Sequence, residues 1–193
     1  MVALCLLRPP LALSVWSRLG IGLCLALAWC APLAAGERAE LTVWGTVTQV
    51  QSATRLALQS PDAGLLKLRL FGVQAPEPPN PRARGEVREG QPFGDQTFAF
   101  IRNLLLGRQV QIRSYGSDHG RLLVVVWLGD INVNLELVKQ GLAWMEPSLR
   151  ILAVRAPLEV AERQAQVGHY GFWELPNPEP PWEFRRRNRL PAE

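Results

Sequence analysis

Five short segments with strand character follow one another along the chain, and one helical segment separates the third from the fourth. They lie in residues 41–59, where a break at Ser52 and Ala53 separates two strands, and in 65–73, 109–113 and 122–128. This succession is typical of a small Greek-key barrel of the OB type that is capped by helices. We therefore predict an α+β fold built on a five-stranded barrel, with about three helices.

The expected helices are marked by apolar spacing and by their ends. Phe98, Ile101 and Leu105 recur at helical spacing in a segment that begins at Asp95 and ends at Gly107. Two further helices are expected over residues 133–144 and 157–166, and the second of these would begin at Pro157, where a missing N–H is harmless. The proline-rich stretch 176–181 is expected to be extended.

Residues 75–94 contain five prolines and three glycines among charges of both signs. Such a composition disfavours a long regular element and predicts an exposed loop. We expect three parts along the chain: a leader over 1–36, a barrel domain over 37–175, and a tail rich in proline and arginine over 176–193.

The leader has the form of an export signal. Arg8 and Arg18 precede the uncharged, apolar stretch 19–35, and small residues just before Glu37 offer a peptidase site. We expect an exported protein, periplasmic or extracellular, with an uncleaved membrane tether through residues 19–35 as the alternative. All three cysteines lie within the leader, so a cleaved product would have no disulfide.

The formal net charge of +4 does not by itself indicate a polyanionic partner. Residues 37–193 carry 19 basic and 17 acidic side chains, so the body of the chain is nearly neutral. Four of these basic residues are the arginines at positions 185, 186, 187 and 189. A terminal run of this kind is commonly solvated, although it could contact nucleic acid or anionic lipid.

One motif stands out from these patterns. Residues 68–77 read LRLFGVQAPE, and they are followed in order by QPFG at 91–94, GRLL at 120–123 and VNLELVKQGLA at 133–143. These segments, with GFW at 171–173, resemble the staphylococcal nuclease (thermonuclease) family in its exported bacterial form. The resemblance implies an OB-fold barrel and the hydrolysis of phosphodiester bonds in nucleic acids.

The resemblance also implies a catalytic set, and all of its side chains are present. Arg69 and Arg121 match the two arginines that bind the phosphate, where planar and permanently charged guanidinium groups suit the charge that develops on its oxygens. Glu77 matches the carboxylate that orients or deprotonates the attacking water. Taken singly, each of the three would be an ordinary surface charge.

The resemblance fails where the family binds its cofactor, a calcium ion. The two aspartate positions align with Thr54, or Ala53 if the turn shifts by one residue, and with Gln74. Calcium takes most of its affinity from carboxylates, so we expect the usual calcium site to be impaired, and we assign no cofactor. Asp118 and His119 replace a lysine and a tyrosine; His119 is a candidate substrate-binding residue, with an ordinary loop histidine as the alternative.

Three functions remain open from the sequence. The first is an exported phosphodiesterase of the thermonuclease type that is weak or atypical in metal use, acts on single-stranded DNA or RNA, and is a monomer. The second is a catalytically lapsed OB-fold module that binds nucleic acid, another ligand or a protein. The third is a membrane-tethered platform for partners.

Overall fold

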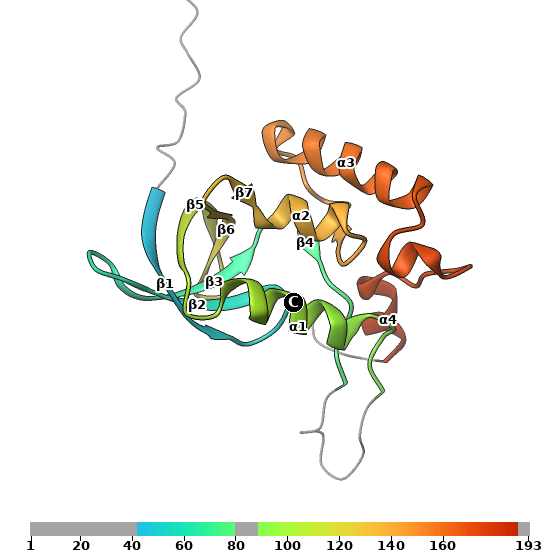
Figure 1. Ribbon diagram of the computed structural model, residues 1–193, viewed down its shortest axis with the longest axis horizontal. Coiled ribbons are helices and arrows are strands. Elements are labelled where there is room, and N and C mark those ends of the chain that lie inside the picture. The colour runs from blue at the N-terminus through green and yellow to red at the C-terminus, as the bar shows by residue number, and fades with distance from the viewer. Residues whose placement is uncertain (1–41, 80–88, 189–193) are drawn as a thin grey trace, which may run out of the picture. The chain divides into compact units, whose positions relative to one another are not determined.

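The protein is described by a computed structural model over residues 42–79 and 89–188 (Figure 1). The expected leader, its cleavage site and its possible tether therefore lie outside the described residues. Within the described ranges, no helix combines the length and the apolar character needed to cross a membrane.

Five strands close into a barrel (Figure 1). They are β1 (Thr42–Val50), β2 (Arg55–Ser60), β3 (Gly64–Leu70), β5 (Gln109–Asp118) and β6 (Arg121–Leu128). The order is β3-β2-β1-β5-β6, and a parallel pairing of β3 with β6 returns the sheet to its first strand. The predicted α+β class and the five-stranded barrel are both confirmed.

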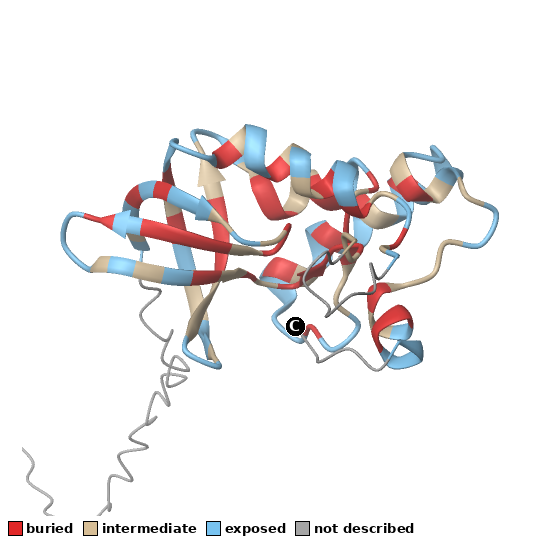
Figure 2. Cartoon of the chain, turned by 90° about the horizontal axis from the view of Figure 1, so that it is seen from below, coloured by how far each residue is buried: buried red, intermediate tan, exposed pale blue. Residues whose placement is uncertain are grey.

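Burial alternates along parts of β1 and β3, whereas β2 and β6 each contain three consecutive buried residues; Figure 2 colours the chain by burial. Leu68 and Leu70 are 0% and 1% exposed, whereas Arg69 between them points outward. The interior is filled by aliphatic residues from every strand, chiefly Val47, Leu56, Leu58, Leu68, Leu70, Val110, Ile112, Val124 and Val126. Helix α1 (Gly94–Leu105) adds Ile101 and Leu105, which are both fully buried.

Two helices after the barrel differ from the expected ranges. Helix α2 (Val133–Lys139) is shorter than expected, because the chain turns at Gly141, whose φ of 63° favours glycine. Helix α3 (Leu152–Val167) begins five residues earlier than expected, so Pro157 lies inside it and not at its start. Proline there deprives the carbonyl of Ala153 of its helical donor, and Ala153 is exposed, so water can replace that bond.

The C-terminal segment also departs from expectation. It forms the 3-10 helix η1 (Gly171–Glu174) and then helix α4 (Pro181–Arg187), so residues 42–79 and 89–188 contain four α-helices. The tail is therefore helical from residue 181, because Pro181 occupies the first helical position, where its fixed φ is favourable. Three short strands complete the chain: β4 (Val73–Gln74), β7 (Ile131–Asn132) and β8 (Trp144–Met145).

Candidate active site

Asn134, a buried residue of α2, holds the turn that follows β3. Its amide nitrogen donates to the carbonyl oxygens of Phe71 at 2.9 Å and Val124 at 3.1 Å, and its amide oxygen accepts from the backbone N–H of Val126 at 3.0 Å. The backbone N–H of Phe71 also donates to Val124, at 2.7 Å. These bonds tie the segment that leads to Glu77 to the central strand β6.

Glu77 itself is held by its backbone. Its N–H donates to the side-chain oxygen of Gln91 at 3.0 Å, and its carbonyl accepts from the backbone N–H of Gln91 at 2.8 Å. The first residue of helix α1, Gly94, packs closely against the backbone of Glu77. A Cβ at Gly94 would lie only 2.4 Å from the carbonyl oxygen of Glu77, so the close approach requires glycine. Glu77, the residue predicted to orient or deprotonate the attacking water, lies near the start of the proline-rich loop. Its backbone is held there by Gln91 and Gly94 near the end of the same loop.

The side chain of Glu77 contacts an arginine that the sequence did not single out. Nη1 of Arg185, in α4, donates to Oε1 of Glu77 at 2.8 Å, and its Nη2 donates to the amide oxygen of Gln74. The side chain of Arg185 is only 8% exposed. The only signal for Arg185 in the sequence is the terminal run of arginines, and such a run does not indicate which of its members is buried.

The two predicted phosphate-binding arginines lie on neighbouring strands. Arg69 in β3 is paired with Leu123 in β6, and Arg121 lies two residues before Leu123, so both arginines face the outside of the barrel on the same side of the sheet. Arg55 in β2 is paired directly with Arg69 and adds a third arginine to this face. Among the described residues, buried Nη1 of Arg121 and Nε of Arg55 have no hydrogen-bond partner.

Arg69 already has an acidic partner. Its Nη1 lies 3.3 Å from Oδ2 of Asp118, and Nδ1 of His119 lies 2.8 Å from Oδ1 of the same carboxylate. The hydrogen bond from His119 is the main cause that lowers the pKa of Asp118, and the charge of Arg69 adds to it, although partial desolvation opposes both. Asp118 therefore stays ionised and competes with any phosphate for Arg69. His119 is itself exposed in the turn, with a φ of 46°.

The residues present do not fit the calcium site that the resemblance implies. Thr54 is buried, with its hydroxyl 3.5 Å from that of Ser52. The methyl side chain of Ala53 has no atom that could bind a metal ion. Gln74 offers an amide oxygen that already accepts from Arg185. Over residues 42–79 and 89–188, no group of three or more histidine, cysteine, aspartate or glutamate side chains could hold a metal ion.

Comparison with known proteins gives the family. The family model for staphylococcal nuclease homologues matches residues 67–175, more than half of the chain. This chain belongs to the staphylococcal nuclease family. The match includes the signature segment, both ends of the proline-rich loop and helices α1 to α3, but it stops before α4.

Several relatives of this nuclease-family chain carry nuclease names. It is 30% identical over 127 residues to an uncharacterized endonuclease of Haemophilus influenzae, covering 65% of this chain and 63% of that one. It is 29% identical over 154 residues to Staphylococcal nuclease domain-containing protein 1 of Drosophila melanogaster, covering 75% of this chain and 17% of that one. It is 27% identical over 124 residues to Probable staphylococcal-like nuclease CAN1 of rice, covering 64% of this chain and 33% of that one. The chain thus spans less than two thirds of the length of each.

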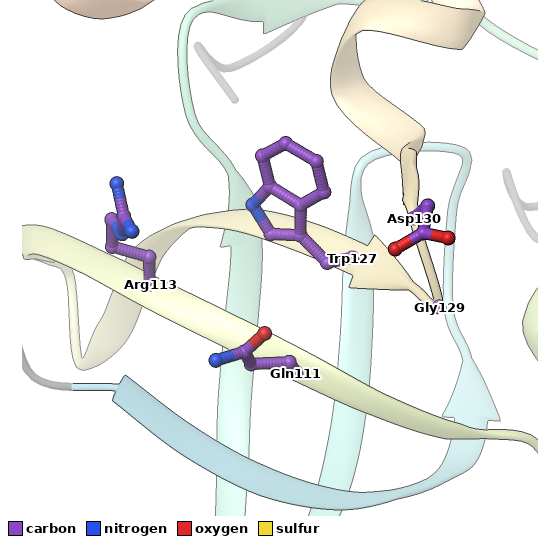
Figure 3. A pocket seen from close by; sticks show the side chains of 5 residues that line it. All are labelled: Gln111, Arg113, Trp127, Gly129 and Asp130. Carbon is purple, nitrogen blue, oxygen red and sulfur yellow. The ribbon is translucent and has the colours of Figure 1, made fainter.

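A separate hollow of about 300 Å³ lies on the outer face of β5 and β6 of this staphylococcal nuclease homologue. Figure 3 shows the indole of Trp127 standing between Arg113 and Asp130, with Gln111 beside it. None of the three predicted catalytic residues lines this hollow. The hollow is therefore separate from the predicted site around Arg69 and Arg121.

Proposed function

We propose that this protein hydrolyses phosphodiester bonds in nucleic acids. Membership of the nuclease family supports the proposal, and the observation that carries it is the β3–β6 register, which puts Arg69 and Arg121 on one face. In the proposed reaction both guanidinium groups bind the phosphate oxygens as negative charge grows on them. Glu77 accepts a hydrogen bond from the water that attacks phosphorus.

Because Arg69 is paired with Asp118, a phosphate can bind Arg69 only by replacing that carboxylate. For Arg69 to hold a phosphate, its Nη1 has to release Asp118, which lies 3.3 Å away, and His119 can keep that carboxylate occupied at 2.8 Å. His119 is exposed beside this pair, so we also propose that it contacts the substrate. Nη1 of Arg121 is buried and has no hydrogen-bond partner among the described residues.

The proposal extends to partner, cofactor and place of action. We propose single-stranded DNA or RNA as substrate, a monomeric enzyme, and turnover that does not follow the family's usual calcium dependence. Export to the periplasm or the cell exterior remains part of the proposal because of the apolar leader. N-terminal sequencing of the mature protein tests cleavage, and a start near Glu37 would exclude the tether through residues 19–35.

A second candidate is a catalytically lapsed module that binds nucleic acid, another ligand or a protein on the same barrel. Two contacts favour it. Asp118 forms an ion pair with Arg69, and Arg185 forms one with Glu77. Two of the three predicted catalytic side chains therefore already have a charged partner.

One assay separates the two functions. The purified protein is incubated with single-stranded DNA and RNA in calcium, in magnesium and in chelator, beside the double variant Glu77→Gln/Arg121→Ala. Removing a single donor to the transition state costs about 100-fold to 1000-fold in rate, so the double variant should lose at least that much. Arg150→Ala, at an exposed arginine outside the site, is the matched control and should keep full activity. If neither the wild type nor the double variant cleaves nucleic acid in any condition, the phosphodiesterase hypothesis is rejected and the catalytically lapsed binding module remains.

A further inference from the structure

Helix α4 brings a buried cation to the corner formed by Gln74 and Glu77. Arg185 is separated from Glu77 by 108 residues and from Gln74 by 111 residues, and it lies ten residues beyond the end of the family match. The contact therefore comes from a part of the chain that the family model does not include. Glu77 and Gln74 are both residues of the signature segment itself.

The position of α4 does not depend on this contact alone. Nε2 of Gln91 donates to the carbonyl of Glu179 at 2.8 Å, which ties the segment before α4 to the residue that brackets Glu77. Arg187 binds both carboxylate oxygens of Glu179, at 3.0 and 2.7 Å. Phe184 is 8% exposed, and Pro181 is also buried. Arg185 is thus delivered by a packed helix.

Charge balance explains why an amide stands at position 74. A guanidinium that is 8% exposed needs a nearby anion, and Glu77 supplies one negative charge at 2.8 Å. Gln74 is 8% exposed and adds an acceptor oxygen without adding charge. Against Arg185, a second carboxylate at position 74 would add a negative charge beyond the one that Glu77 supplies, whereas a divalent cation would gain affinity from it.

We propose that Arg185 is the resident cation of this corner and occupies the place that a divalent ion would otherwise take. It acts as a positioning residue, because it holds the carboxylate of Glu77 and the amide of Gln74 in one arrangement. The idea rests on the proposed function only in the role assigned to Glu77. The amide at position 74, one of the two departures from a calcium-binding site, then follows from an arginine of the C-terminal helix.

Calcium affinity tests this proposal without any turnover. Thr54→Asp and Gln74→Asp are introduced together into the full chain, and calcium chloride is titrated by isothermal calorimetry with Arg185 present and with Arg185→Gln. The guanidinium should compete with the ion, so removing it should tighten calcium binding at least tenfold. Arg186→Gln in the same background is the matched control, since Arg186 is the exposed neighbour in α4, and it should leave the affinity unchanged.

Equal calcium affinities with and without Arg185, or no binding in either protein, would overturn the proposal. Arg185→Met is made in parallel, because it keeps the length of the side chain if the glutamine variant folds poorly. Near-ultraviolet circular dichroism verifies the fold of each variant before titration. Competition between Arg185 and calcium is measured by binding, and it can be present or absent whether or not the protein cleaves nucleic acid. Failure of this proposal can therefore be distinguished from failure of the proposed function.

Discussion

Nη1 of Arg185 lies 2.8 Å from Oε1 of Glu77, although the two residues are 108 positions apart in sequence. The pair joins the last helix of the chain to the segment that carries the nuclease signature. The C-terminal helix is consequently part of the structure of the candidate site. Truncating the tail would remove more than a solvated basic run.

The Arg185–Glu77 pair should be strongly coupled in folding. Breaking a buried ion pair leaves one charge without its partner, so Arg185→Met should lower the free energy of unfolding by about 3 kcal/mol. Combined with Glu77→Gln, the loss should be smaller than the sum of the single losses by about 1 to 2 kcal/mol. Urea unfolding of the four proteins measures this coupling.

The control for that cycle is Arg187→Met, since Arg187 pairs with Glu179 while its side chain is 63% exposed. An exposed ion pair contributes little to stability, so Arg187→Met should change the free energy of unfolding much less than Arg185→Met. Additive losses at Arg185 and Glu77 would contradict the contact between them.

Asp118→Asn should free Arg69 for phosphate. Removing the negative charge that lies 3.3 Å from Nη1 of Arg69 should strengthen the binding of a single-stranded oligonucleotide about fivefold at low salt. Because the pKa of Asp118 is lowered, wild-type Asp118 loses its charge only below its usual range, so the advantage of the variant should persist from neutral to mildly acidic pH. Fluorescence anisotropy at two salt concentrations measures it.

Asp62→Asn is the control for Asp118→Asn, because Asp62 lies exposed in the turn between β2 and β3. It removes the same charge from a different place on the barrel. An equal gain in both variants would show that net charge, not release of Arg69, is responsible.

Asn134→Leu should destabilise the fold and loosen the signature turn. It removes three hydrogen bonds at 2.9 to 3.1 Å and leaves buried backbone groups of β6 and of Phe71 without those bonds. The free energy of unfolding should fall by about 2 to 4 kcal/mol. Asn132→Ala, which removes only the N-cap of α2, should cost about 1 kcal/mol, and equal losses would contradict the special role of Asn134.

Glu162 should make stability depend on pH. Burial is the main cause that raises its pKa, against the N–H of Met145, which donates to its carboxylate at 2.9 Å and lowers the pKa. The folded state therefore binds this proton more tightly than the unfolded state, and Glu162 reduces stability as pH rises through its folded pKa. Glu162→Gln should gain melting temperature relative to wild type at pH 7, and the gain should shrink toward pH 4.

Glu174→Gln, at an exposed glutamate of η1, should show no such trend in thermal melts. A gain from Glu162→Gln that is the same at both pH values would mean that the carboxyl group titrates normally.

The sequence by itself determined the succession of five barrel strands along the chain, the helix between the third and fourth of them, and the family. These depend on periodicity over a few residues and on ordered motifs, which can be read without coordinates. It also placed Arg69 and Arg121, but their common face follows from the register of β3 against β6. The same register reasoning on β2 and β3 would have found Arg55.

Only the tertiary structure decided what surrounds the signature. The burial of Arg185, its contact with Glu77 and Gln74, and the pairing of Arg69 with Asp118 join residues between 49 and 111 positions apart. Local patterns carry no information about such contacts, because several arginines in one run are alike until packing buries one of them. Helix α4 exists for the same reason: the packing of Phe184 and Pro181 against the body supplies the stabilisation that a seven-residue helix lacks alone.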